Sequence, residues 1–164
     1  MTSPDSFFDA PFPPAPVLEP FARIRCAVSP LVSLGSAPLG ERRYVPLAGG
    51  EVRGPGLSGR IVEGGVDWQI ARADGVLEID AHYVIEANDG ARIEVRSQGL
   101  RHGPPEVMAR LARGEDVPAS DYYFRTVVRL TTGAPAWAHL NRQLLISVGC
   151  RQASSVLLSL YSLS

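Results

Sequence analysis

Two pairs of side chains in this chain are suited to acid–base chemistry. If two tight turns align the strands between residues 66 and 98, Asp67 lies opposite His82. A carboxylate in that position holds the imidazole in one tautomer, so the pair can act as a general base. Tyr123 and Arg125 lie two residues apart on one strand face and form a second candidate, a site for an oxyanion or a carboxylate. We therefore predict that these four residues are catalytic.

The neighbours of these pairs are predicted to bind the substrate. Arg101 lies in a glycine-rich loop before a predicted helix, where it could gate a pocket, and a solvated loop is the alternative. His139 and Asn141 share one face of a later predicted strand. The predicted substrate-binding residues are Trp68, Gln69, Asp80, Tyr83, Arg101, His139 and Asn141.

Turn chemistry sets the predicted register. Asp74-Gly75 suits a two-residue type I′ loop, which would pair Asp67 with His82 and Gln69 with Asp80. For residues 88–90, a three-residue loop with a left-handed glycine aligns the apolar residues better. One face would then carry Asp67, Gln69, Asp80, His82, Arg96 and Gln98, and the other Val66, Trp68, Ile70, Ile79, Ala81 and Tyr83.

The polar face has a second interpretation. In antiparallel sheets the usual alternation places polar residues toward solvent and apolar residues toward the core. Under it, Asp67 and His82 belong to a solvated face, while Trp68 and Tyr83 still line any internal pocket. For the later residues the alternative is a structural hydrogen-bond network that closes the barrel, formed by Tyr123, Arg125, His139 and Asn141.

The chain as a whole is predicted to be an all-β protein with one short helix. Prolines at 104 and 105, followed by an apolar face and Gly114, predict a helix near 104–113. The final segment is apolar on both faces and cannot remain an open edge, so we predict a closed antiparallel barrel of the lipocalin or calycin type. About nine or ten strands are expected, including segments 21–28, 42–47, 51–53, 57–63, 66–72, 122–130, 138–148 and 155–163.

The N-terminus differs in composition from the rest. Six prolines in residues 1–20 predict an extended arm, and residues 21–164 a single barrel domain. Phe7, Phe8 and Phe12 could anchor the arm to the barrel or to another subunit, and a floppy tail is the alternative.

Composition bounds the partners. The chain has 164 residues, 45% of them hydrophobic, and a net charge of -1, and its 16 basic residues are interleaved with acidic ones. We therefore expect no nucleic acid and no membrane as partner, and a cytoplasmic location.

Three scattered histidines predict no metal, and no nucleotide-binding motif is present, so no cofactor is expected. Cys26 and Cys150 are expected to be free thiols, or a disulfide in an oxidising compartment.

Several sequence blocks resemble a known family. They are Arg43-Tyr44-Val45-Pro46, Gly64-Gly65-Val66-Asp67-Trp68-Gln69, Asp80-Ala81-His82-Tyr83, Gly99-Leu100-Arg101-His102-Gly103, Tyr123-Phe124-Arg125-Thr126 and Leu140-Asn141-Arg142. In order and spacing they resemble domain of unknown function 3237, a family of bacteria and fungi. The resemblance implies a compact β-barrel with a ligand-sized interior and no assigned reaction. His82 and His139 stand where that pattern more often has arginine and an aromatic residue.

These observations lead to three functional hypotheses. The first is a cofactor-free enzyme that isomerises, dehydrates or cyclises a small organic molecule by proton transfer. The second is a non-catalytic ligand carrier of the same shape. The third is a structural module whose apolar last strand and N-terminal arm form the interface of a homo-oligomer.

Overall fold

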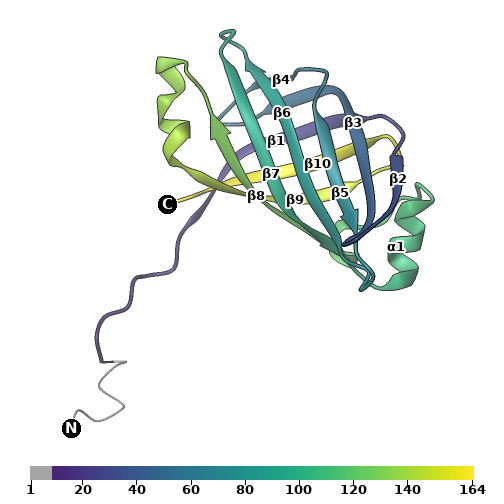
Figure 1. The fold of residues 1–164 in the computed structure, drawn as a ribbon. Coiled ribbons are helices and arrows are strands. Elements are labelled where there is room, and N and C mark those ends of the chain that lie inside the picture. Colours follow the sequence, from purple (N-terminus) through teal and green to yellow (C-terminus); the bar gives the residue numbers. More distant parts are fainter. Residues whose placement is uncertain (1–8) are drawn as a thin grey trace.

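The computed structural model describes residues 9–164, whose strands form one antiparallel barrel (Figure 1). The strands are β1 (Leu18–Val28), β2 (Val32–Ala37), β3 (Gly40–Arg53), β4 (Gly59–Ile61), β5 (Val66–Ala71), β6 (Leu77–Ala87), β7 (Arg92–His102), β8 (Tyr123–Thr131), β9 (Leu144–Arg151) and β10 (Ser155–Leu163). The predicted all-β class and closed antiparallel barrel are confirmed.

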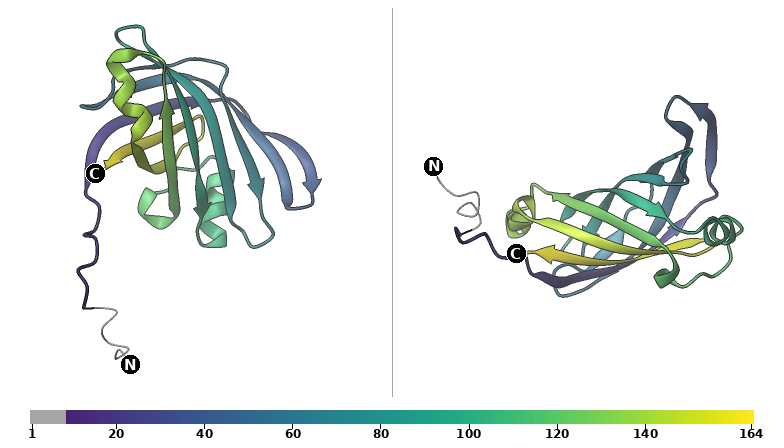
Figure 2. Two further views of the ribbon diagram at one scale, coloured as in Figure 1. Left: turned by 60° about the vertical axis from the view of Figure 1, so that its left-hand side comes forward. Right: turned by 90° about the horizontal axis from the view of Figure 1, so that it is seen from below.

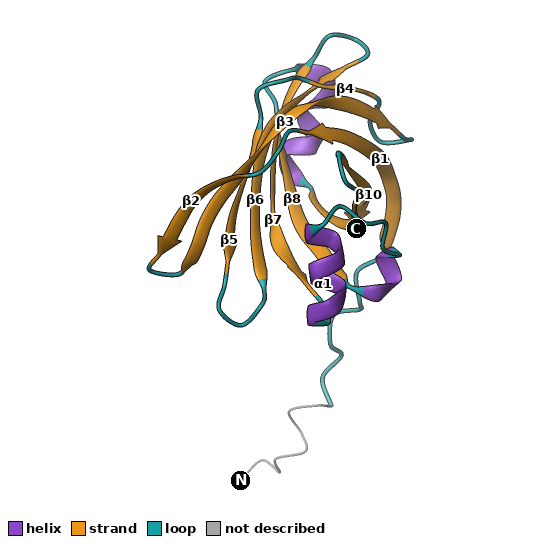
Figure 3. Ribbon diagram, turned by 90° about the vertical axis from the view of Figure 1, so that its right-hand side faces the viewer, coloured by secondary structure: helices purple, strands orange, loops and turns teal. Residues whose placement is uncertain are grey.

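Closure of the barrel follows from the strand order. The sheet runs β1-β10-β9-β8-β7-β6-β4-β3, and β3 pairs with β1 to close the ring. β4 and β5 share one position, because each pairs with both β3 and β6. β2 pairs only with β3 and projects from the ring (Figures 2 and 3). The apolar strand β10 pairs with β1 along one edge and with β9 along the other. Its edges therefore need no second subunit, and the predicted homo-oligomer stays a prediction.

Short helices lie at the two ends of the barrel (Figure 1). The predicted helix is confirmed as α1 (Pro105–Ala112), and its Leu111 is buried against residues such as Leu77 and Phe124. A 3-10 turn, η2, covers Ala119–Asp121, and a longer 3-10 helix, η3 (Pro135–Arg142), lies at the end opposite α1. In the described residues no helix is long and apolar enough to cross a membrane.

The prediction of a strand over residues 138–148 is wrong in its first half. Residues up to Arg142 belong to η3, and β9 begins at Leu144. Two bonds of Asn141 hold this helix against the preceding loop: Oδ1 accepts from the Thr132 N–H at 2.8 Å, and Nδ2 donates to the Thr132 carbonyl at 2.9 Å. The Trp137 indole also donates to Asp89 at 2.8 Å. Side-chain hydrogen bonds thus hold this segment as a helix, where the prediction had strand pairing.

The turn between β5 and β6 differs from the prediction and changes the register. The Arg72 N–H donates to the Val76 carbonyl at 2.9 Å, which leaves a three-residue loop, 73–75, with Gly75 at φ +86°. The Asp74 carboxylate accepts from the Val76 N–H at 3.2 Å, which stabilises this loop. Asp67 therefore pairs with Ala81, and the predicted pairing of Asp67 with His82 is wrong.

The turn between β6 and β7 is confirmed as predicted. Ile85 pairs with Ile93 around a three-residue loop whose Gly90 has φ +87°. Its Asp89 accepts from the Ala91 N–H at 3.0 Å, just as Asp74 does in the first hairpin. The two hairpins thus share one construction.

The barrel is packed solid at the η3 end. Its most deeply buried side chains there include Ile85, Ile93, Val95, Leu140 and Leu145. A second apolar cluster beneath α1 contains Leu77, Ile79, Leu111, Val117, Tyr122 and Phe124. The polar inner residues described below lie between these two clusters.

The N-terminal segment joins the barrel earlier than expected. β1 begins at Leu18, which pairs with Leu163, rather than at Phe21. Phe12 is largely exposed, and Phe7 and Phe8 lie outside the described residues. Anchoring by the arm stays a prediction.

Replacing Gly75 tests the left-handed turn. We expect Gly75→Ala to lower the free energy of unfolding by about 1 kcal/mol, because an L-residue is strained at positive φ although the added methyl group meets no atom within 4 Å. Gly133→Ala is the matched control, since it also has open space but no positive φ. Urea unfolding of both variants measures the difference, and an equal effect at the two sites would contradict this reading of the turn.

Candidate active site

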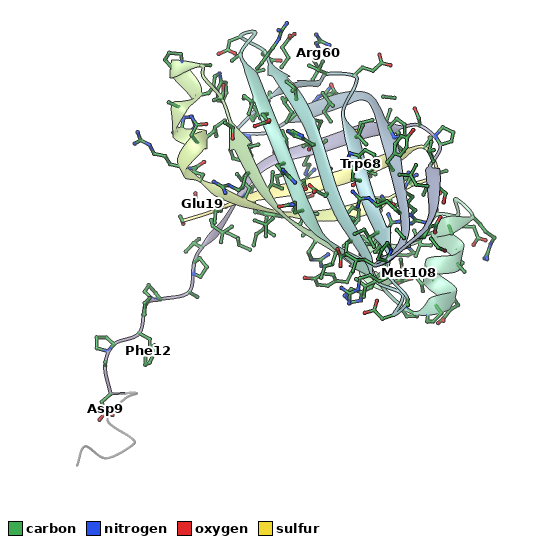
Figure 4. All side chains as sticks on the ribbon, in the orientation of Figure 1. Asp9, Phe12, Glu19, Arg60, Trp68 and Met108 are labelled. Atoms are coloured by element: carbon green, nitrogen blue, oxygen red, sulfur yellow. The ribbon has the colours of Figure 1, made fainter. Side chains whose placement is uncertain are left out.

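The inner face of β5 carries the acidic residue of the site. Because side chains alternate along a strand, the observed register places Asp67 and Gln69 on the same side of the wall as Ile79, Ala81 and Tyr83. Trp68 consequently lies on the outer face, where its ring is 5.0 Å from that of Tyr44 (Figure 4). The expectation that Trp68 lines the pocket is wrong, and Asp67 is inside without His82.

Two predicted site residues on β6 face solvent. His82 is exposed and its Nε2 lies 2.8 Å from Oε2 of Glu94, while Asp80 accepts two hydrogen bonds from Arg96 at 3.1 and 2.9 Å. His82, Asp80 and Arg96 do share one face, as predicted. That face is the outside of the barrel, so His82 and Asp80 cannot reach a molecule held in its interior.

The second predicted pair also lies on the outer wall. Tyr123 is 45% exposed, the Arg125 guanidinium lies 5.2 Å from its ring, and His102 stacks on it with centroids 4.8 Å apart. The neighbours of the pair along β8, Phe124 and Thr126, are the buried ones. The two residues share a face as predicted, but they do not line the interior.

The two candidates from the predicted strand over 138–148 are likewise remote from the interior. His139 is exposed on η3 and stacks on Trp137 with centroids 6.1 Å apart. Asn141 is committed to its two bonds with Thr132. A helix does not present these residues as a strand would, so they do not meet Tyr123 and Arg125 at one site.

The interior contains a cavity that opens beside α1. Its inner part holds about 50 Å³, room for a few water-sized groups. It is lined by Cys26, Val28, Val45, Leu47, Asp67, Gln69, Ile79, Ala81, Tyr83, Ser97, Arg101, Phe124, Thr126, Arg151, Val156 and Leu158. Gln69, Arg101 and Arg151 also line a wider mouth of about 680 Å³, where Met108 and Leu111 of α1 form part of the rim. Figure 4 labels Met108 at this end of the barrel.

Asp67 is poised to exchange a proton. Its Oδ2 accepts from Gln69 Nε2 at 2.7 Å, and Gln69 Oε1 in turn accepts from Arg43 Nε at 3.1 Å. Its Oδ1 is buried and has no hydrogen-bond partner within residues 9–164. Burial raises the pKa of Asp67 to about 6, although the Gln69 bond and the charge of Arg101 oppose this change. Near neutral pH the group can therefore act as acid or base.

Arg101 supplies a buried positive charge. It is the last inward-facing residue of β7, after Ile93, Val95, Ser97 and Gly99, so the prediction that it lies in a loop is wrong. Its guanidinium carbon is 5.6 Å from the Phe124 ring, and its Nε has no partner in the described part of the chain. Burial lowers its pKa to about 10, which leaves it charged at neutral pH.

Two further arginines were missed in the sequence. Arg43 on β3 and Arg151 on β9 both line the mouth. Each continues the inward alternation of its strand, Arg43 with Val45 and Leu47, and Arg151 with Leu145, Ser147 and Gly149. That alternation was the available signal, but it becomes usable only when the inner face of each strand is known.

The remaining polar groups of the wall stay neutral. Burial raises the pKa of the Cys26 thiol to about 11 and also raises the pKa of Tyr83. The hydroxyl of Ser97 donates to Thr126 at 2.7 Å, and Thr126 lies 2.6 Å from the Ser147 hydroxyl. Cys26 and Cys150 are both free. The pKa of Asp67, at about 6, lies much closer to neutral pH than that of Cys26.

The arrangement can therefore transfer a proton beside a fixed positive charge. Asp67 provides the proton-transfer group, and Arg101 can stabilise a developing or existing anion. In the part of the chain that the structure describes, no cluster of three or more His, Cys, Asp or Glu side chains could hold a metal ion.

Comparison with known proteins identifies the family. Residues 16–163 match the family described as Protein of unknown function (DUF3237). The chain belongs to this family. It is 37% identical to a UPF0311 protein of Rhodopseudomonas palustris over 138 residues, which cover 84% of this chain and 90% of that protein. A UPF0311 protein of Clostridium acetobutylicum is 34% identical over 126 residues, covering 77% and 80%. The predicted resemblance is confirmed.

Solved structures of relatives share the barrel. A conserved protein of unknown function from R. palustris has a TM-score of 0.87 at 34% identity, covering 93% of this chain and all of that one. A structure described as beta-barrel like, from Acinetobacter baumannii, has a TM-score of 0.82 at 35% identity, covering 93% and 99%.

A fungal enzyme is a more distant relative. The structure of an enzyme from Penicillium herquei has a TM-score of 0.72 at 20% identity, covering 94% and 99%, which shows a shared fold. A stretch of 49 residues is 43% identical to the hydroalkoxylation enzyme phnH of the same fungus, covering 30% of this chain and 32% of that one.

Replacing Asp67 tests whether its pKa is raised in the folded protein, through the pH dependence of the free energy of unfolding. Because the folded-state pKa is raised from about 3.8 to about 6, ionisation of Asp67 destabilises the fold as pH rises through this range. We expect Asp67→Asn to gain up to about 3 kcal/mol in free energy of unfolding, relative to wild type, between pH 4 and pH 7.5. The charged or ionisable groups that interact with Asp67 are Arg101, Arg151, Asp80, Cys26 and Tyr83.

Urea unfolding at both pH values measures this difference. Asp74→Asn is a control of opposite sign, because the hydrogen bond from Arg72 lowers the pKa of Asp74, which lies on the exposed turn. Its ionisation stabilises the fold, so that variant should lose stability relative to wild type as pH rises. A gain for Asp67→Asn that does not change with pH would refute the raised pKa.

Proposed function

We propose that this protein is a cofactor-independent enzyme that transfers a proton to or from a small organic molecule held inside the barrel. The proposed reaction class is isomerisation, dehydration or cyclisation. One observation carries the proposal: Asp67 lies in the cavity near the charged Arg101, with a pKa of about 6 and an Oδ1 that has no hydrogen-bond partner among the described residues. Fold alone would not support it.

The energetic cost of this arrangement supports a catalytic role. A buried polar atom without a hydrogen bond costs about 1 to 3 kcal/mol. In the described part of the chain the cavity holds two such atoms, Asp67 Oδ1 and Arg101 Nε, whereas the other end of the barrel is packed with aliphatic side chains. Perturbed titratable groups in a cleft are characteristic of active sites.

Cyclisation is the reaction that we favour within this class. The fungal relative is named for hydroalkoxylation, the addition of an O–H group across a carbon–carbon double bond. In the proposed step, protonated Asp67 gives its proton to one alkene carbon, and the substrate hydroxyl oxygen bonds to the other. The hydroxyl proton then returns to the Asp67 carboxylate. Bonds and charge balance, so the step needs neither an oxidant nor a reductant.

A prenylated phenol provides a direct test. We expect wild-type protein to convert ortho-prenylphenol in D₂O near pH 6 to its cyclic ether, with one deuterium on the carbon that was protonated, as measured by NMR. Asp67→Asn should lower the rate at least about a hundredfold, because it removes the proton-transfer group. Retention of turnover by Asp67→Asn would rule out this role.

His82→Gln is the matched control. His82 is also ionisable and lies on the neighbouring strand, but on the outer wall beside Glu94. Its replacement should leave turnover unchanged. A loss equal to that of Asp67→Asn would move the chemistry to the outer face, and no turnover by the wild type would reject the assignment to cyclisation.

A ligand carrier is the second candidate function. The lining of Val28, Leu47, Ile79, Phe124 and Leu158 offers an apolar surface that binds hydrocarbon without chemistry. A carrier would bind ortho-prenylphenol saturably and return it unchanged and without deuterium. Asp67→Asn would then bind it at least as well as wild type.

A further inference from the structure

The geometry points to an organic anion as the ligand of this barrel, with a carboxylate-type head group bound by Arg43, Arg101 and Arg151 where the cavity meets its mouth. This inference rests on the proposed function, because it names the substrate class of the same site. The head-group site consists of the three arginines and does not require proton transfer by Asp67.

The charged side chains that line the mouth are all positive, although the net charge of the whole chain is slightly negative. Four arginines line the mouth, and none of the described residues lining it is acidic. One of them, Arg72, is neutralised by Asp74 and Glu78. Arg43 lies 3.8 Å from Glu41, which is not part of the mouth lining. Arg101 and Arg151 form no ion pair within 4.0 Å in residues 9–164, in a chain whose net charge is -1. A concave site lined by one sign of charge concentrates ligands of the opposite sign.

Asp67 does not neutralise this group. It is the sole acidic residue among the described residues that line the cavity, and it forms no ion pair within 4.0 Å there. Arg43 and Arg151 each lie near enough to Arg101 to disfavour its charge. Asp67 in the cavity and Glu41 beside Arg43 are two carboxylates against three guanidinium groups. An excess of positive charge is left, which a bound anion would offset.

Arg101 is the centre of the proposed head-group site. Its Nε is buried without a hydrogen-bond partner in residues 9–164, so a donor is available to an incoming oxygen atom. A guanidinium presents its N–H groups in a planar fork that matches a carboxylate. The guanidinium carbon of Arg101 lies 5.6 Å from the centre of the Phe124 ring, which packs against the guanidinium group.

The two other arginines are already oriented by the wall. Arg43 donates through Nε to Gln69 at 3.1 Å, and Arg151 donates through Nη1 to the Ser155 carbonyl at 3.0 Å and to the Gln152 carbonyl. These bonds occupy few of the five N–H donors of each side chain. Arg43 Nη1 also lies 3.8 Å from Glu41, and the other donors of the two side chains can meet an anion with little loss of side-chain entropy.

The same end of the barrel can hold the apolar body of such a ligand. The mouth, at about 680 Å³, includes Leu77, Met108 and Leu111 in its lining. Figure 3 shows α1 at the edge of this end of the barrel. Volumes of this order accept drug-sized molecules, which combine an apolar body with one fixed polar group.

A matched pair of fluorescent probes tests the inference. Anilinonaphthalene sulfonate and N-phenylnaphthylamine share one ring system, but only the first carries an anion. We expect wild-type protein to bind the sulfonate at least about tenfold more tightly, measured by fluorescence titration at pH 7.5 and low salt, with a preference that falls as salt rises. Equal affinities for the two probes would overturn the inference.

Arginine variants locate the head-group site. Arg101→Gln should weaken sulfonate binding about tenfold and leave the neutral probe unaffected, because one charge-assisted hydrogen bond is lost. Arg43→Gln, at the mouth and outside the packed core, should act in the same direction and serves if Arg101→Gln does not fold. Arg129→Gln is the control, because Arg129 is exposed on the outer face of β8. If neither mouth variant affected the sulfonate more than the control, the inference would be wrong.

Asp67→Asn separates this inference from the proposed function. It removes the proton-transfer group and one negative charge, so it should abolish turnover while sulfonate binding stays equal or becomes tighter. If wild-type protein turns over ortho-prenylphenol but shows no preference for the anionic probe, the enzyme assignment stands and the anionic ligand class is rejected. If it prefers the anionic probe but shows no turnover, the ligand class stands and the enzyme assignment is rejected.

Discussion

The pairing of β5 with β6 is the constraint on which the site depends. Side chains alternate between the two faces of a strand, so a slip by one residue would send Asp67 and Gln69 to solvent and Trp68 inside. The three-residue loop 73–75, with its left-handed glycine and the Asp74 bond to Val76, selects the observed pairing. A local turn thus determines which ionisable group the barrel encloses.

The barrel divides its inner space between stability and chemistry. Side chains such as Ile85, Leu140 and Leu145 fill the η3 end without exposure to solvent. Toward α1 the wall instead carries Asp67 and Arg101, whose burial opposes folding. Because folded proteins are stable by only about 5 to 15 kcal/mol, such groups persist where packing elsewhere offsets their cost.

The outer wall shows that plausible residue pairs do not by themselves make a site. His82 with Glu94, Asp80 with Arg96 and Tyr123 with Arg125 are all well placed to interact. They are partly or largely exposed, and exposed ion pairs contribute about 0 to 1 kcal/mol. Solvent screens their charges, whereas the cavity perturbs the titration of Asp67. The relatives of this chain share the barrel, and its chemistry depends on what faces inward.

The amino-acid sequence by itself determined the family, the all-β class, the helix at 105–112 and the turn at 88–90, because these depend on local patterns of proline, glycine and apolar residues. It also identified Asp67, Gln69, Tyr83 and Arg101 as candidates by type. Only the tertiary structure decided that these four face inward and that His82, Trp68 and Tyr123 face outward. The physical reason is that alternation assigns residues to two faces but does not say which face closes on itself, and one residue in a turn reverses the answer.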